Sequence, residues 1–280
     1  MKIIALTTCF NRRDITLRAL ESLQQQSLPP GYSMEICIVD DGSSDGTSNA
    51  IQSAFSDVTI LNGNGELYWA GGMRFGWDNY VERQDMDYLL VFNDDVKLFP
   101  NAIEKLIAAA LEVKISGCED FVISGSFCEP KTNTVAYGGL RRSSRWHPLR
   151  FSKIEPTANI QECDTLNMNL ALISNHALRQ IGFLSSGYIH GKADYDFGLR
   201  LREKGGRVVL AAGFIGECGK NSTKGTSNEP GISFKERWDR LTSIKEQSPG
   251  QRALYYRRHS GLLWPIFWIL PYLKVCLGGK

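Results

Sequence analysis

The chain has 280 residues, of which 42% are hydrophobic and 22% are charged, and this composition indicates an ordinary folded protein rather than a disordered one. Its formal net charge of +2 argues neither for nor against nucleic acid, and since basic residues are scattered apart from one local cluster, we expect no nucleic-acid partner. The seven cysteines include no CxxC pair, which is typical of reduced thiols in a cytosolic protein. Neither a signal peptide nor a spanning helix of roughly 20 apolar residues is expected.

The first hundred residues alternate between strand-like and helix-like segments. Apolar runs predict strands over residues 2–6, 35–39, 58–61 and 89–92, and apolar residues at helical spacing predict helices over 15–26, 48–55 and 73–82. A glycine-containing loop over 62–73 is expected to lie close to a ligand or to another stretch of the backbone. Such a β-α-β-α-β alternation predicts an α/β fold with a mostly parallel sheet flanked by helices.

The second half of the chain continues the alternation with one irregular excursion. We expect helices over residues 100–113, 175–181 and 197–204, strands over 121–126, 164–173 and 207–212, and a hairpin arm at 134–139. The excursion is basic and poor in apolar residues; it carries Arg141, Arg142, Arg145, His147, Arg150 and Lys153. It is predicted to be a mobile solvated loop or, alternatively, to contact an anionic substrate or a membrane surface.

Acidic residues gather at the ends of predicted elements. Asp40 and Asp41 follow one strand, Asn93-Asp94-Asp95 follow another, and Asp194 with Asp196 precede a helix. Because ligands of open α/β sheets lie at the carboxyl ends of the strands, these groups are expected to share one site. Adjacent carboxylates are costly to bury unless a divalent cation joins them. The alternatives are a polar turn, an Asp cap and a helix N-terminal carboxylate.

Four segments of this chain resemble the motifs of one enzyme family. Residues 39–47 are similar to the VDDGSxDGT motif, and residues 7–13 to a first-strand motif that ends in Asn-Arg. Asn93-Asp94-Asp95 resembles a metal-binding DxD element, and residues 193–200 resemble an EDxDxxxR block. The resemblance covers roughly residues 2–215 and is to the inverting nucleotide-sugar glycosyltransferases of family 2, which have the GT-A fold. Within that family, the chain is similar to bacterial polysaccharide rhamnosyltransferases.

The resemblance implies a role for each matched residue. Donor-binding residues would be Thr8, Asn11, Arg12, Asp40, Asp41, Gly71, Gly72, Asn93 and Asp94. Asp95 would ligate Mg²⁺ or Mn²⁺ at the diphosphate of a UDP-, dTDP- or GDP-linked sugar. Asp194 would be the catalytic base toward a glycan or polyprenyl-lipid-linked acceptor, with Asp196 as the other candidate. The glycine pair, with Trp69, would shape the sugar pocket, or would serve only in loop packing.

The sequence departs from the family pattern at two places. Ala193 replaces the acid that precedes the base, which leaves Asp194 and Asp196 as alternatives. Where many relatives carry a metal-binding histidine, this chain reads Gly216-Glu217-Cys218-Gly219, so the metal is expected to be held by Asp95 and phosphates alone, or weakly. His190 lies near the base in sequence and is predicted to contact the acceptor or a phosphate, or else to be structural.

The C-terminal end is the last distinct segment. We expect a catalytic domain over residues 1–225, in which residues 1–99 bind the nucleotide and residues 100–225 bind the acceptor, followed by an extension over 226–280. The apolar run 261–274 contains two prolines and is flanked by Arg and Lys, with Trp and Tyr at its edges, which suits a membrane interface. The resemblance to bacterial enzymes that act on lipid-linked acceptors implies peripheral attachment to the inner face of the cell membrane, and packing on the domain or in a homodimer is the alternative. The expected function is sugar transfer in surface polysaccharide biosynthesis. An inactive glycan-binding or scaffold subunit and a sugar-phosphate nucleotidyltransferase are the alternatives.

Overall fold

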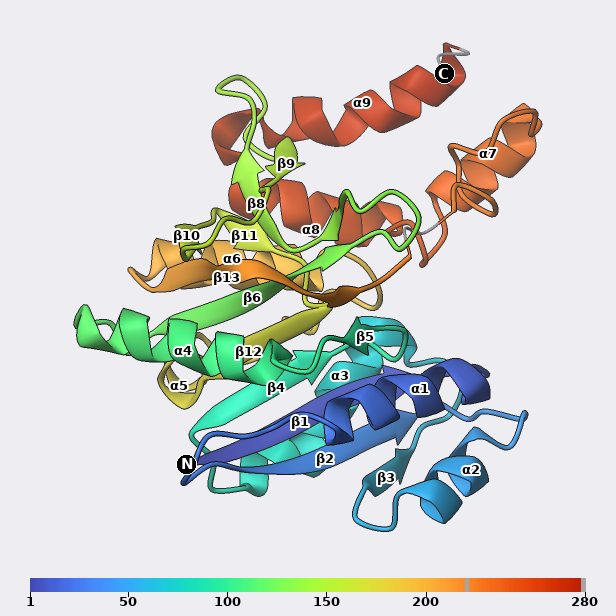
Figure 1. Ribbon diagram of the computed structural model, residues 1–280. Coiled ribbons are helices and arrows are strands. Elements are labelled where there is room, and N and C mark those ends of the chain that lie inside the picture. Colours follow the sequence, from blue (N-terminus) through green and yellow to red (C-terminus); the bar gives the residue numbers. More distant parts are fainter. Residues whose placement is uncertain (220–221, 278–280) are drawn as a thin grey trace.

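The protein is built around one large twisted sheet with helices on both faces (Figure 1). The computed structural model describes residues 1–219 and 222–277. The strand order is β10-β13-β6-β12-β4-β1-β2-β3. Strand β12 runs antiparallel to both of its neighbours, whereas β3, β2, β1 and β4 pair in parallel, as do β6 and β13. The predicted α/β class with a mostly parallel sheet is therefore confirmed.

The N-terminal region forms the predicted β-α-β-α-β unit. Its elements are β1 (Lys2–Cys9), α1 (Arg13–Gln24), β2 (Ser33–Asp40), α2 (Thr47–Ala54), β3 (Thr59–Asn62), α3 (Tyr68–Asn79), the short 3-10 helix η1 (Val81–Arg83) and β4 (Tyr88–Phe92). Helix α3 begins at Tyr68, so the expected loop is shorter than predicted. Gly72 lies inside this helix, where a Cβ atom would overlap the Thr8 side chain. The glycine therefore allows α3 to lie directly against β1.

The region that follows completes the sheet and adds a small one. Its elements are β5 (Lys97–Leu98), α4 (Ala102–Ile115), β6 (Phe121–Cys128), β7 (Val135–Tyr137), β8 (Gly139–Arg142), β9 (Phe151–Lys153), β10 (Gln161–Glu162), β11 (Thr165–Leu166), β12 (Leu170–Ser174), α5 (Asn175–Ile181), α6 (Ala193–Glu203) and β13 (Arg207–Glu217). The strand predicted over 164–173 is two strands, because β11 pairs with β8 and β12 joins the main sheet. The basic excursion was predicted to be a mobile solvated loop, but its two ends form strands, since β8 and β9 pair with each other.

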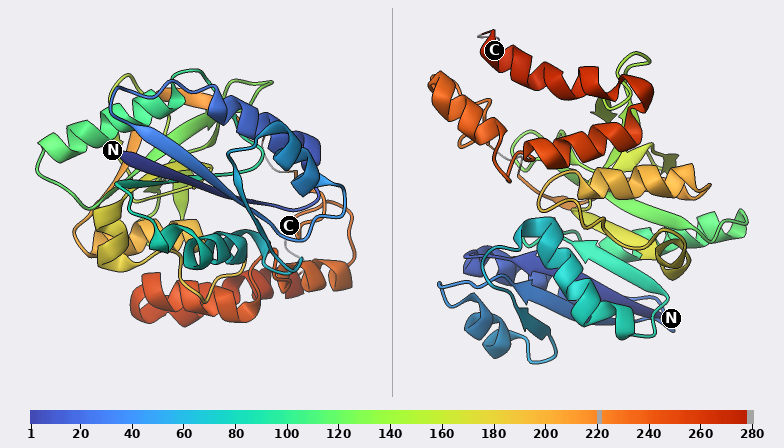
Figure 2. Two further views of the ribbon diagram at one scale, coloured as in Figure 1. Left: turned by 90° about the horizontal axis from the view of Figure 1, so that it is seen from below. Right: turned by 180° about the vertical axis from the view of Figure 1, so that it is seen from behind.

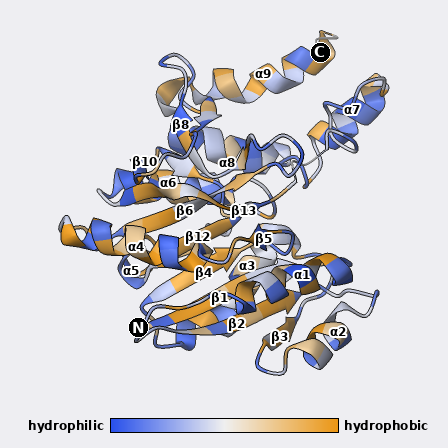
Figure 3. Cartoon of the chain, in the orientation of Figure 1, coloured by the Kyte–Doolittle hydropathy of each residue, from blue (hydrophilic) through white to orange (hydrophobic). Residues whose placement is uncertain are grey.

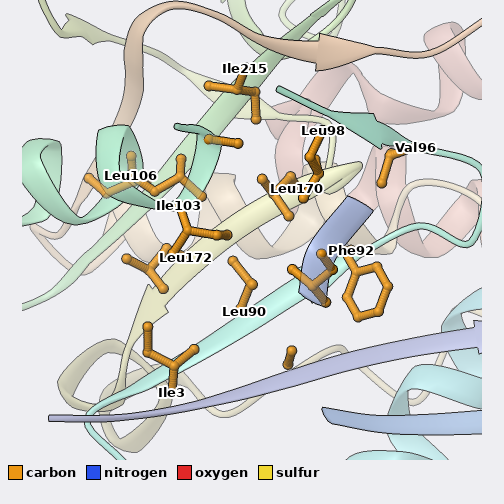
Figure 4. Close-up of a cluster of buried hydrophobic side chains, with 14 of the residues drawn as sticks. Ile3, Leu90, Phe92, Val96, Leu98, Ile103, Leu106, Leu170, Leu172 and Ile215 are labelled. Atoms are coloured by element: carbon orange, nitrogen blue, oxygen red, sulfur yellow. The ribbon is translucent and has the colours of Figure 1, made fainter. Parts of the chain in front are cut away.

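Two hydrophobic clusters cover the two faces of the sheet. One contains Leu90 and Phe92 of β4, Leu170 and Leu172 of β12, and side chains of α1 and α4 (Figure 4). The other holds side chains of α3, α5, α6 and the C-terminal region of the chain, and the right-hand view of Figure 2 shows these helices on the face of the sheet away from α1 and α4. All five residues of β4 are buried, which agrees with a strand that is covered on both faces. The residues that follow β4 are consequently fixed at the edge of a rigid sheet.

The C-terminal region consists of α7 (Phe234–Leu241), α8 (Pro249–His259), the short 3-10 helix η2 (Gly261–Leu263) and α9 (Trp264–Cys276). Helix α8 packs on the body of the molecule, where Tyr255 belongs to one of the two main clusters. Helices α7 and α9 share a separate small cluster. None of the helices within residues 1–219 and 222–277 is long and apolar enough to cross a membrane. Within the predicted extension, α8 thus belongs to the body, and α7 and α9 lie outside it.

Candidate active site

A cleft of about 860 Å³ lies where β1 and β4 end and α6 begins. Seven of the predicted site residues line it: Thr8, Arg12, Asp41, Asn93, Asp94, Asp95 and Asp194. The others, Asn11, Asp40, Gly71, Gly72 and Asp196, do not line it. Acids more than 150 positions apart in the sequence are thus brought to one cavity, as the strand-end argument predicts.

Asp40 and Asp41 organise the backbone on one side of the cleft. Asp40 is buried and accepts hydrogen bonds from the backbone N–H of Ser43 at 2.9 Å and from the hydroxyl of Ser48. Asp41 accepts from the N–H groups of Gly65 and Leu67, both at 2.9 Å, and of Tyr68 at 3.1 Å. The Asp41 carboxylate therefore fixes the loop before α3 and also satisfies N–H groups at the start of that helix.

The glycine pair of the predicted sugar pocket has a different location. Gly71 and Gly72 lie within α3, and the N–H groups of Ala70 and Gly71 both donate to the carbonyl oxygen of Ile189, at 3.0 and 3.2 Å. These contacts hold α3 against the segment that leads to α6. Trp69 does face the cleft, and its Nε1–H donates to Asn93 Oδ1 at 2.9 Å. The structure therefore places the aromatic residue in the cleft and the glycines behind it.

Arg12 joins the end of β1 to the acids after β4. Its Nη1 lies 2.7 Å from Asp94 Oδ1 and 3.3 Å from Asp95 Oδ2. The preceding residue, Asn11, has a left-handed backbone (φ 51°) and accepts from the N–H of Ser44 through its Oδ1 at 2.7 Å. Asn11 therefore shapes the turn that directs Arg12 toward the two carboxylates.

The pair Asp94 and Asp95 has the character of a cation site. Burial raises the pKa of Asp94 to about 6, although the Arg12 guanidinium opposes this effect. Asp94 Oδ2 is buried without a hydrogen-bond partner. Cys218 Sγ lies 3.8 Å from Asp95 Oδ1, at the place where the family pattern has a histidine. No group of three His, Cys, Asp or Glu side chains among residues 1–219 and 222–277 is arranged to hold a metal. Carboxylate oxygens suit Mg²⁺ or Mn²⁺, so these acids fit a hard divalent cation that takes further ligands from a substrate.

Asp194 lies in the first turn of α6 and lines the cleft. Its Oδ1 accepts from the N–H of Tyr195 at 2.9 Å. Burial raises the pKa of Asp194, and the ammonium of the neighbouring Lys192 opposes the rise. Lys192 has a left-handed backbone (φ 71°), and its Nζ lies 3.7 Å from the centre of the Tyr195 ring. A cleft carboxylate with a raised pKa has the properties of a general base.

Asp196 is in different surroundings, fully buried between α6 and α8. Its oxygens lie 2.8 Å from Arg200 Nε, 2.6 Å from Arg258 Nη1 and 2.9 Å from His259 Nε2. Ser185 and Tyr188 also donate to it, at 3.0 and 3.2 Å. Despite its burial, these hydrogen bonds and cations lower the pKa of Asp196. The geometry therefore gives Asp196 a structural role and leaves Asp194 as the acid in the cleft.

The cleft also contains residues that the sequence did not point to. Among them are Tyr68, Asn167, Asn169, Lys192, Tyr195, Lys245, Glu246 and Gln247. Residues 245–247 precede α8 and carry no local pattern, so only the packing of α8 could have revealed them. His190, for which a substrate contact and a structural role were the two alternatives, lines the cleft beside Tyr68 at a ring-centre distance of 6.1 Å.

Comparison with known proteins shows that the protein is a glycosyltransferase with the GT-A fold. The sequence model described as glycosyl transferase family 2 matches residues 5–159, and the chain belongs to this family. No curated protein sequence matches the chain.

Two solved structures illustrate the fold. A mannosyltransferase from Pyrobaculum calidifontis, in complex with GDP-Man and Mn²⁺, superposes with a TM-score of 0.56 at 13% identity, over 97% of this chain and 69% of that one. GalNAc-T7, with UDP, GalNAc and Mn²⁺, superposes with a TM-score of 0.59 at 12% identity, over 91% of this chain and 50% of that one. This chain therefore spans about two thirds of the first protein and half of the second.

Proposed function

We propose that this glycosyltransferase uses a nucleoside-diphosphate sugar and transfers the sugar, with inversion, to a hydroxyl group of a glycan or lipid-linked acceptor in surface polysaccharide biosynthesis. The observation that carries the proposal is the cleft, which is lined both by the cluster of Arg12, Asp94 and Asp95 and by the carboxyl group of Asp194, whose pKa is raised. The two structural neighbours support it, because both hold a nucleotide and Mn²⁺.

The donor diphosphate would bind at the end of β4. Asp95, with Asp94 beside it, would hold Mg²⁺ or Mn²⁺, and the unpartnered Asp94 Oδ2 is an oxygen available to such a cation. When bound, the cation neutralises negative charge on the leaving diphosphate. Arg12 already contacts both acids and would provide a second positive charge there.

The acceptor would bind on the α6 side of the cleft. Asp194 would remove the proton from the attacking hydroxyl, and its raised pKa makes it a stronger base than an exposed aspartate. Lys192 lies close enough to Asp194 to oppose the rise in its pKa, so it helps to keep the base ionised. Because Asp194 at the start of α6 and the Asp94–Asp95 pair after β4 line the same cleft, an acceptor hydroxyl at Asp194 would share that cleft with a donor held at the pair.

The test is a panel of UDP-, dTDP- and GDP-linked sugars, measured by thermal shift with and without Mn²⁺. One donor class is expected to raise the melting temperature by mass action, and more strongly with Mn²⁺. Asp95→Asn should remove the effect of Mn²⁺, whereas Asp78→Asn, an exposed acid outside the cleft, should not. If no donor shifts the wild-type protein and none is turned over, the chain is a glycan-binding or scaffold subunit instead.

A further inference from the structure

The outer face of α9 is an apolar stripe that nothing in the described chain covers. Ile266, Ile269, Leu270, Leu273 and Leu277 recur at helical spacing and are all exposed, and Leu262 of η2 is 98% exposed. The opposite side of α9 carries Trp268, Tyr272 and Val275, which pack against α7. Helix α9 is therefore attached by one face and presents the other to its surroundings. Figure 3 shows this helix at the edge of the molecule, with many of its residues hydrophobic.

The basic loop between β8 and β9 lies beside the N-terminal end of α9 (Figures 1 and 2). The His147 ring contacts the Phe267 ring, with 4.7 Å between their centres. Next to it, Trp146 is 83% exposed, and Arg145 and Arg150 are exposed as well. Two segments more than 100 residues apart in the sequence thus form one surface, which combines large apolar side chains with arginines.

The charge of this surface is opposite to that of the rest of the molecule. Residues 139–154 and 249–277 contain nine Arg and Lys and no Asp or Glu. Since the whole chain has a net charge of +2, the remainder carries −7. Arg252 and Arg258 point inward, but no exposed arginine of the β8–β9 loop forms a salt bridge within the described residues.

We propose that α9 and the β8–β9 loop together form a docking surface for an anionic lipid bilayer. An apolar stripe bordered by Arg and Trp suits the boundary between headgroups and acyl chains. A second copy of the chain is a poorer occupant, because two surfaces with this charge repel each other. A nucleic acid would satisfy the arginines and leave the leucines in water.

The test uses the full-length protein with vesicles of phosphatidylcholine alone or mixed with phosphatidylglycerol. The protein should sediment with the anionic vesicles, bind the neutral ones much more weakly, and dissociate as salt is added. Leu270→Glu with Leu273→Glu should abolish binding, whereas Ile115→Glu, an 87% exposed isoleucine at the end of α4, should leave it unchanged. All three side chains are exposed, so thermal unfolding should stay close to that of the wild type.

The loop is tested separately. Arg145→Ala with Arg150→Ala should weaken binding about 25-fold, at about five-fold for each charge, whereas Arg18→Ala with Lys204→Ala should not. The proposal is overturned if the wild type ignores anionic vesicles, if the leucine and control variants bind alike, or if light scattering shows a dimer that the leucine variant dissociates. Donor binding in the same variants is independent of this surface, so failure of the transferase proposal would be recognised separately.

Discussion

Asp194 and Asp196 are two positions apart in α6, yet their surroundings shift their pKa values in opposite directions. Burial raises the pKa of Asp194 although the charge of Lys192 and hydrogen bonds from Tyr195 N–H and Asn167 oppose the rise, whereas His259, Arg200 and Arg258 lower the pKa of Asp196. Carboxyl groups whose pKa values are separated in this way serve different purposes. The separation favours Asp194 as the proposed base, because Asp194 lines the cleft and Asp196 does not.

We predict that Asp194→Asn reduces sugar transfer by about 10²- to 10⁴-fold while donor affinity is retained. The amide cannot accept the proton of the acceptor hydroxyl, but it preserves the shape of the cleft. In the wild type, kcat/KM should rise with pH through a pKa above that of an ordinary aspartate, because the base must be ionised. Steady-state kinetics with a donor-binding titration check this, and Asp78→Asn is the control. Transfer within a few-fold of wild type would remove Asp194 from the mechanism.

The raised pKa of Asp94 has a consequence for stability. Its folded pKa of about 6 lies above the unfolded value near 3.9, so ionised Asp94 costs free energy of folding above pH 6 and none well below pH 3.9. Asp94→Asn should therefore raise the free energy of unfolding by roughly 2–3 kcal/mol at pH 8 and change it little at pH 3.5. Urea denaturation at both pH values measures it. The same variant should lose stabilisation by Mn²⁺; equal stability at pH 8 would contradict the burial argument.

At the scale of elements, local pattern predicts the strands and most helices but not the contacts that set their ends. The apolar runs of β1 and β2 are sufficient to place them. The start of α3 is not predictable in this way, because it depends on hydrogen bonds to Asp41. Their donors are the N–H groups of Gly65, Leu67 and Tyr68, which lie 24 to 27 positions later in the chain. The acids of the cleft are predictable from their motifs. Lys245 and its neighbours are not, since they reach the cleft only through the packing of α8.

The ion cluster around Asp196 joins α6, which carries the proposed base, to α8. Asp196→Asn should lower the free energy of unfolding by about 3–5 kcal/mol at pH 7, because Arg200 and Arg258 would keep their charges without a counterion. The pKa of Asp196 is lowered by folding, so this stability is present above the unfolded pKa near 3.9 and declines as the pH falls below it.

The two variants to compare by chemical denaturation are Asp196→Asn and Glu162→Gln. Glu162 forms an exposed pair with Arg207, and its loss should cost at most about 1 kcal/mol. A similar small loss for both variants would show that the buried cluster does not hold α8 to α6.

On the scale of the whole molecule, α8 lies between the cleft and the proposed lipid surface. On one side, Gln251 Oε1 accepts from the N–H of Ile189, in the segment that leads to α6. On the other side, the Nε1–H of Trp268 in α9 donates to the carbonyl oxygen of Pro249 at 3.1 Å. A bilayer bound by α9 would thus be connected to the acceptor side of the cleft through α8.

This arrangement predicts different outcomes for two C-terminal truncations. A chain that ends at Ser260 keeps Arg258 and His259 on Asp196, so it should fold and bind donor but lose vesicle binding. A chain that ends at Ser248 lacks both partners and leaves Asp196 with the charge of Arg200 and the hydroxyl groups of Ser185 and Tyr188. Since removing a partner of a buried ion pair costs about 3–5 kcal/mol, the shorter chain should unfold at much lower temperature or aggregate. Differential scanning calorimetry with a donor titration distinguishes the two truncated chains. Equal stability of both chains would show that α8 does not stabilise the catalytic body.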